Sequence, residues 1–217
     1  MGDGQDGARQ LGFWAAIACA LLGSTYAMLQ LLEWLGLFGS AGGPASVSTV
    51  TGLALLLTPS LLLGSAFLIL LAALHQAAPA GRRAISQAAL GFATVYATLI
   101  SMVYFTQLTL VAPRMAAHDV TGLEPFLFVP YRTFLFAVDL LGYSMMSIST
   151  LLAAFALPAG RFAGSARFAL LANGLLVPFL ALQMLWPALI WGGALWGLTF
   201  PAAMIFIALL MRNTPNE

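Results

Sequence analysis

Six long apolar runs, separated by short polar or glycine-rich connections, constrain the fold of this chain more than any other feature. A helix rises about 1.5 Å per residue and the hydrocarbon core of a bilayer is about 30 Å thick, so roughly 20 apolar residues cross it. Each run is close to this length or longer. We therefore expect six transmembrane helices, at residues 11–37, 49–74, 84–111, 134–157, 168–185 and 189–211.

The shortage of charge excludes a soluble protein. Of all residues, 61% are hydrophobic and 7% are charged, whereas soluble domains carry about 25% charged residues. The fold class that follows is all-α, a polytopic membrane helix bundle with one transmembrane domain over residues 11–211. Residues 1–10 and 212–217 are expected to be short tails, the first of them disordered, and residues 113–133 an outer loop.

The distribution of arginine predicts the orientation of the bundle. Six of the eight arginines fall in the two tails or in the second and fourth connections. They are Arg9, Arg82, Arg83, Arg161, Arg167 and Arg212. Only Arg114 and Arg132 lie in the outer loop, so by the positive-inside rule both termini should be cytoplasmic. Abundant alanine, with arginine but no lysine, is typical of a GC-rich bacterial genome, so the expected location is the inner (plasma) membrane.

Residue types that are scarce or missing exclude several cofactors. The chain has no lysine, which excludes a Schiff-base chromophore, and one cysteine, Cys19, which excludes an internal disulfide. The two histidines, His75 and His118, lie outside the middle of any apolar run, so neither a bis-histidine haem nor a zinc site is expected. We expect no cofactor, metal or nucleic acid. The expected partners are membrane lipid and a small hydrophobic ligand, and the oligomeric state is open.

Polar side chains from five segments converge on the predicted outer face. Glu33 lies near the end of the first span and Asp139 near the start of the fourth. Tyr26, Gln30 and Glu33 are spaced four and three apart, which places them on one helix face. The candidate ligand-binding residues are Tyr26, Gln30, Glu33, Tyr104, Gln107, Arg132, Asp139, Tyr143 and Gln183. No catalytic residue is assigned.

Asp139 is the most informative of these residues. A charged side chain at membrane depth costs about 2.5–3.5 kcal/mol on insertion scales unless it is protonated or paired. Tyr143, Ser147 and Thr150 follow it at helical spacing, so we expect Asp139 to face the bundle interior. One interpretation is a proton-binding or ligand-binding carboxyl. The other is a first-turn aspartate that meets the positive end of the helix dipole and pairs with Arg132. Its protonation state is open.

Glu33 also has two interpretations. It precedes Trp34 near the predicted interface, where tryptophan commonly anchors a helix, so its carboxylate could extend to the headgroups. Alternatively, it lines one wall of a pocket with Tyr26 and Gln30. The protonation state of Glu33 is open as well.

Two further motifs surround these residues. The outer-loop segment GLEPFLFVPYRTF is too short to span a membrane, so it is either an interfacial loop fixed by its aromatic residues or a lid over the bundle. The small residues of WGGALWG, in the last span, favour close helix packing over ligand binding.

Part of the chain resembles a known group of proteins. The run Tyr-Phe-Thr-Gln-Leu-Thr at Tyr104–Thr109, the acidic residue before Leu-Gly-Tyr at Asp139–Tyr143, and the Met-Ser run after it are similar to a family of uncharacterised small multi-pass bacterial membrane proteins. The resemblance covers about a quarter of the chain, around Tyr104–Thr150. It implies membrane location and no activity, cofactor or catalytic residue.

Three functions are compatible with these features. The first is binding or transport of a small apolar or amphiphilic ligand in a polar pocket near the outer face, since few charges are present to neutralise an ionic ligand. The second is an intramembrane enzyme acting on a lipid or isoprenoid, with Glu33 or Asp139 as the proton donor. The third is a structural or accessory membrane subunit, whose polar cluster only fixes helix packing.

Overall fold

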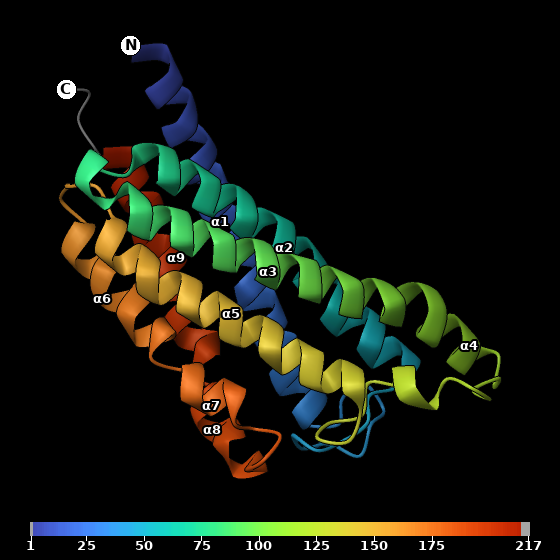
Figure 1. Ribbon diagram of the computed structural model, residues 1–217. Helices are drawn as coiled ribbons and strands as arrows, with labels where there is room; N and C mark the ends of the chain where they lie inside the picture. Colours follow the sequence, from blue (N-terminus) through green and yellow to red (C-terminus); the bar gives the residue numbers. More distant parts are fainter. Residues whose placement is uncertain (1, 214–217) are drawn as a thin grey trace.

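The computed structural model describes residues 2–213, and within this range the chain folds into helices and connections without strands (Figure 1). The principal helices are α1 Gly2–Trp34, α2 Val50–Ala77, α3 Arg83–Thr106, α5 Phe134–Ala156, α6 Ala163–Gly174 and α9 Trp196–Asn213. Six helical segments of the described chain are long and apolar enough to cross a membrane. The prediction of an all-α, six-helix membrane bundle is confirmed.

Short helical pieces extend several of these helices or interrupt the connections. They are η1 Ala80–Arg82, the π-helical η2 Gln107–Val111, α4 Ala112–Ala116, η3 Glu124–Phe126, α7 Val177–Ala181, η4 Pro187–Leu189 and α8 Ile190–Gly193. The candidate membrane spans run over Asp6–Trp34, Val50–Ala77, Ala80–Ala116, Phe134–Ala156, Ala163–Ala181 and Pro187–Arg212.

Two details of the structure differ from the sequence-based expectation. Helix α1 begins at Gly2, so residues 2–10 form its first turns, and the expectation of a disordered tail is wrong for them. The third helical segment continues to Ala116, so the outer loop begins four residues later than expected, at Ala117. Residue 1 and residues 214–217 of the expected tails lie outside the described residues.

The principal helices form a closed ring. Helix α1 packs against α2 and α9, and the remaining neighbours are α2 with α3, α3 with α5, α5 with α6, and α6 with α9. Short connections make consecutive helices antiparallel, so the first and last helices reach the same end of the bundle (Figure 1). The connections 35–49, 117–133 and 182–186 lie at the opposite end, which we call the distal end.

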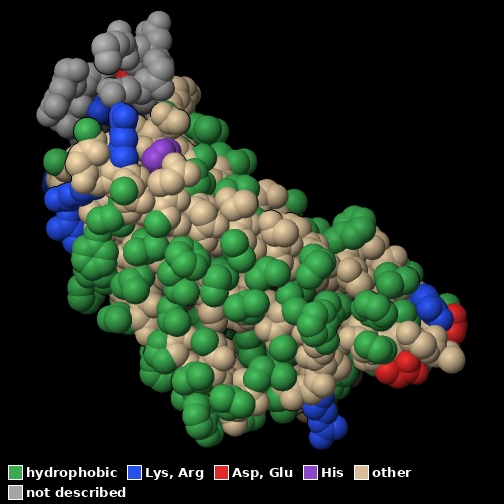
Figure 2. Space-filling view, in the orientation of Figure 1, with side chains coloured by type: hydrophobic (Ala, Val, Ile, Leu, Met, Phe, Trp, Pro, Cys, Tyr) green, Lys and Arg blue, Asp and Glu red, His purple; other side chains and the backbone are tan. Residues whose placement is uncertain are grey.

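The surface of the bundle matches a hydrocarbon environment. Figure 2 shows hydrophobic side chains along the flank, while arginine and acidic side chains occur at the ends of the molecule. Several large apolar side chains face outward, among them Leu21 at 65% and Phe168 at 76% exposure. Such exposure is costly in water but not in lipid, whose tails are as apolar as these side chains.

A capping residue fixes the start of α2 and the loop before it. The side chain of Thr49 accepts a hydrogen bond from the backbone N–H of Gly52 at 3.1 Å, which satisfies one of the free amides of the first turn. Its hydroxyl also donates to the carbonyl of Phe38 at 2.7 Å. One side chain therefore positions both the helix start and the glycine-rich connection, which contributes to the wall of the site described below.

A buried hydrogen-bond chain ties three helices together in the interior. Asn173 of α6, which is 0% exposed, donates to the Thr150 hydroxyl of α5 at 3.0 Å and accepts from the Thr199 hydroxyl of α9 at 3.0 Å. Hydrogen bonds between membrane helices contribute about 0.6–2 kcal/mol each. This chain fixes helix packing, and Thr150 of the predicted polar stripe belongs to it.

Gly174 allows α6 to approach the backbone of α5. A methyl group placed there would lie 2.6 Å from the Cβ and 2.8 Å from the Cα of Leu151. We expect Gly174→Ala to lower the free energy of unfolding by about 1–2 kcal/mol, because the overlap involves backbone that cannot move aside. Unfolding in mixed micelles of mild and denaturing detergent measures this cost. Gly164→Ala on the same helix meets no atom within 4 Å and should be neutral; equal losses in the two variants would contradict the packing.

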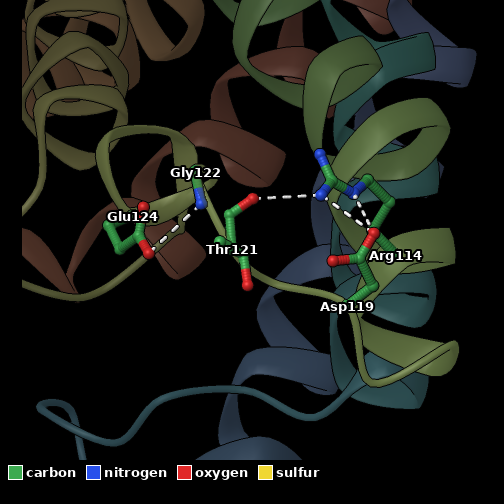
Figure 3. A network of polar contacts seen from close by, with 5 residues as sticks. All are labelled: Arg114, Asp119, Thr121, Gly122 and Glu124. Carbon is green, nitrogen blue, oxygen red and sulfur yellow. Dashed lines mark hydrogen bonds and ion pairs between the residues drawn. The ribbon is translucent and has the colours of Figure 1, made fainter.

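The outer loop is held by its own contacts, several of which Figure 3 shows. Arg114 pairs with Asp119 at 2.9 Å and donates to the carbonyl of Thr121 at 3.0 Å, while the Glu124 carboxylate accepts from the backbone N–H of Gly122 at 3.3 Å (Figure 3). The ion pair is exposed and therefore contributes little to stability. A stronger restraint comes from Gln107 of η2, whose side-chain amide donates to the Phe126 carbonyl at 2.6 Å.

Candidate functional site

A cavity of about 360 Å³ opens near the distal end of the bundle. Its walls come from the last two turns of α1, the first turns of α5, and the segment from α7 to the start of α9. The connections at 43–46 and 128–130 contribute the remaining wall. The volume is at the lower end of the range typical of small-molecule sites, about 300–1,000 Å³.

Aromatic rings form the inner end of this cavity. The ring centroids of Tyr26 and Tyr143 are 6.2 Å apart and stacked, and both rings meet Trp196 edge-on, at 5.8 Å and 5.3 Å. The indole N–H of Trp196 donates to the sulfur of Met146 at 3.3 Å. Because α1, α5 and α9 each supply one ring, the cluster joins three helices that are distant in sequence.

Asp139 lies beside this cluster and is 6% exposed. The Tyr104 hydroxyl donates to its Oδ1 at 2.6 Å and also lies 3.3 Å from the Tyr143 hydroxyl. The prediction that Asp139 faces the bundle interior is confirmed. Pairing with Arg132 is not observed: that side chain is exposed, and no ion pair between the two is found among the described residues.

Glu33 is buried in the part of the wall that α1 contributes, with 2% exposure, so the interpretation of a carboxylate extended to the headgroups is wrong. Within the described chain, neither carboxyl oxygen has a hydrogen-bond partner. The carboxyl group lies against the first turn of α2, where a methyl group on Gly52 would come within 2.9 Å of Oε2. A glycine at this position therefore makes room for the Glu33 side chain.

Gln183, in the turn after α7, is another buried residue at this cavity whose polar atoms lack partners. It is 0% exposed, and neither its amide oxygen nor its amide nitrogen is hydrogen-bonded within the described residues. A methyl group on Gly193 would lie 2.6 Å from Nε2, so the small residue in α8 accommodates the amide. The Ser46 hydroxyl, on the same cavity wall, lacks a partner as well. Buried polar groups in proteins are nearly always hydrogen-bonded, so their accumulation at one cavity needs an explanation.

The cavity also reaches the lipid-facing surface. Leu31 and Leu198 line it and are 58% and 72% exposed, so it opens sideways between α1 and α9. The two helices come close at Ala27 and Gly197, where a methyl group on the glycine would lie 3.0 Å from the Ala27 Cβ. We call the opening beside Leu31 and Leu198 the lateral opening.

Six of the nine sequence-predicted residues line this one cavity. They are Tyr26, Gln30, Glu33, Asp139, Tyr143 and Gln183. Tyr104 does not line it and instead orients Asp139, whereas Gln107 holds the outer loop and Arg132 is exposed.

The sequence does not single out Trp196, Phe128 of the outer loop or Phe136 of α5 as cavity residues. The rings of the two phenylalanines contact each other at a centroid distance of 5.3 Å. The signal for Trp196 was present in WGGALWG, whose glycines do permit close packing: Gly192 abuts the ring of Phe179. That motif serves helix packing and places a cavity residue at the same time.

The outer loop covers part of the cavity. Phe128 and Pro130 line the wall, and Tyr131, with a positive φ of 61°, turns the chain into α5 and meets Phe136 edge-on at 5.2 Å. Partial burial raises the pKa of the Tyr131 phenol, so it is neutral at physiological pH. The loop therefore presents apolar side chains, those of Phe128 and Pro130, to the cavity.

The described part of the chain contains no candidate metal site. Within residues 2–213, no three side chains of the His, Cys, Asp and Glu types gather closely enough to hold a metal ion.

Comparisons with protein-family models, with curated proteins and with solved structures give no match for this chain. The partial resemblance of Tyr104–Thr150 therefore identifies no family. The described chain is a multi-pass membrane bundle with a polar and aromatic cavity near its distal end.

Proposed function

We propose that this protein binds, and through binding transports, a small amphiphilic ligand in the cavity between α1, α5 and α9. The observation that carries this proposal is the pair of buried groups without partners, Glu33 and Gln183, on the wall of one cavity. An unsatisfied buried polar group costs about 1–3 kcal/mol, and more when it is charged. A ligand that supplies the missing hydrogen bonds recovers part of this cost.

The shape of the cavity fits an amphiphile. Its lining combines polar groups at Glu33, Asp139 and Gln183 with apolar walls at Leu31 and Leu198. The lateral opening lets the apolar part of a ligand remain in lipid while its polar part enters. An accessory subunit, whose polar residues only fix packing, gives no reason for a cavity at this position. The chain has its packing network elsewhere, at Asn173.

Two substitutions at neighbouring positions test this proposal. Ala194 lines the cavity, whereas Leu195 is 50% exposed and is not part of the lining. In lipid nanodiscs, Ala194→Trp should weaken binding of a small amphiphile such as 5-phenylpentan-1-ol by about tenfold or more, which corresponds to about 1.4 kcal/mol. Leu195→Trp should leave the affinity unchanged. Isothermal titration with empty nanodiscs as the blank measures both affinities. Equal affinities in the two variants would show that the amphiphile does not bind in this cavity.

The orientation of the bundle decides which side the cavity faces. We propose that both termini are cytoplasmic, which puts the distal end and the cavity on the outer side of the membrane. In a Cys19→Ala background, Gly81→Cys and Gly160→Cys should be protected from an impermeant thiol reagent in intact cells. Thr121→Cys in the outer loop should be labelled. Labelling of the first two from outside, with protection of the third, would reverse the orientation.

A further inference from the structure

The charges around the cavity have one sign. Glu33 and Asp139 both line it, and among the described residues of its lining there is no arginine or histidine. The chain contains no lysine at all. The outer-loop arginines do not compensate: Arg132 is exposed and Arg114 pairs with Asp119. A ligand with negative charge would meet two acidic groups and no cation.

The aromatic residues of the same cavity favour a positive charge. Tyr26, Tyr143 and Trp196 cluster at its inner end, and Trp34 lines it nearer the distal end. Aromatic faces attract ammonium groups within about 6 Å of the ring centroid, and tryptophan does so most strongly. Carboxyl groups combined with several rings are the arrangement that recognises quaternary and tertiary ammonium ions in proteins.

Of the two carboxyl groups, that of Glu33 gains more than that of Asp139 from a nearby cation. Asp139 already accepts a hydrogen bond from Tyr104, whereas both oxygens of Glu33 lack a partner in the described chain. An unpaired carboxylate at this depth is unfavourable, and a cation beside it removes that penalty.

We infer that the ligand is a singly charged organic cation with an apolar body, of the tertiary or quaternary ammonium class. This inference rests on the proposed function and narrows its ligand. The cationic head lies between Glu33 and the aromatic cluster, and the apolar body extends past Leu31 and Leu198 through the lateral opening. Neutralisation by Glu33 also explains how a chain with so few charges can bind an ion.

Three probes of nearly equal shape and different charge test the inference. Benzyltrimethylammonium is the cation, neopentylbenzene replaces its nitrogen by carbon, and phenylmethanesulfonate is the anion. With the wild-type protein in nanodiscs, and empty nanodiscs as the blank, the cation should bind about tenfold or more tightly than the neutral probe. The anion should bind most weakly.

Variants then assign the preference to the cavity. Glu33→Gln should bring the ratio of the affinities for the cation and for neopentylbenzene close to one, since the side chain keeps its size and loses its charge. Glu124→Gln, at an exposed acid of the outer loop, should change neither affinity. A melting curve of each variant checks that it is folded, and the comparison of the three probes on the wild type does not depend on any variant.

The outcomes separate the two proposals. Equal or weaker binding of the cation relative to neopentylbenzene overturns the cation inference and leaves the proposed function intact. Absence of binding by all three probes overturns the proposed function and the inference with it. A preference for the cation that survives Glu33→Gln places the charge recognition elsewhere and contradicts the inference.

Discussion

Replacing Trp196 by alanine should lower the free energy of unfolding by about 3–5 kcal/mol, the range for large aromatic residues in packed cores. Trp196 is 5% exposed and contacts rings from two other helices, Tyr26 and Tyr143, besides stacking on Phe200 at 4.9 Å. Truncation leaves a void at the inner end of the cavity, and the lost contacts have no replacement. The loss of stability should appear as unfolding at a lower fraction of denaturing detergent in mixed micelles.

Trp14 provides a control that distinguishes the loss of packing at Trp196 from the loss of a tryptophan as such. Trp14 on α1 is 60% exposed toward the lipid-facing surface, so Trp14→Ala should cost little. The same two variants should differ in binding as well, because only Trp196 lines the cavity. If both variants unfolded at the same detergent fraction, the aromatic cluster would not be a packed core.

Replacing Tyr104 by phenylalanine should cost about 3 kcal/mol, at the upper end of the range for an orphaned buried acceptor, because the acceptor is a carboxyl group in a membrane bundle. The lost hydroxyl donates to Asp139 Oδ1 at 2.6 Å, a distance typical of a strong hydrogen bond. Asp139→Asn should be mild, since its amide oxygen accepts the same hydrogen bond. Unfolding in mixed micelles measures each variant.

The control is Tyr131→Phe, which removes a hydroxyl that has no hydrogen-bond partner within the described chain. It should be nearly neutral. The double variant Tyr104→Phe, Asp139→Asn completes a cycle whose coupling energy belongs to this one contact. A coupling energy near zero would show that the Tyr104–Asp139 contact contributes nothing to stability.

The helices and much of the candidate site follow from the sequence for a simple reason. Hydropathy determines which segments enter the membrane, and helical spacing then determines which residues share a face. Tyr26, Gln30 and Glu33 were placed together on this basis, and all three line the cavity. The stripe below Asp139 was likewise enough to predict that it faces the interior.

The remaining features depend on how the helices rotate and approach, which no single helix encodes. Glu33 could have faced the headgroups, and its burial depends on the space at Gly52 of the next helix. Arg132 is near Asp139 in sequence, yet the chain turn at Tyr131 leaves it exposed. Trp196 was overlooked because its role requires rings from α1 and α5, more than 50 residues away.

We propose that an amphiphile occupies the cavity beside Trp196. The most direct measurement is the fluorescence of a variant that keeps Trp196 and carries phenylalanine at the other four tryptophans, titrated in nanodiscs with a ring nitroxide bearing a trimethylammonium group. We expect saturable quenching that excess benzyltrimethylammonium reverses, whereas a variant that keeps only Trp14 should show weak quenching that rises linearly with lipid partitioning. Linear, irreversible quenching of equal size at both tryptophans would contradict the claim.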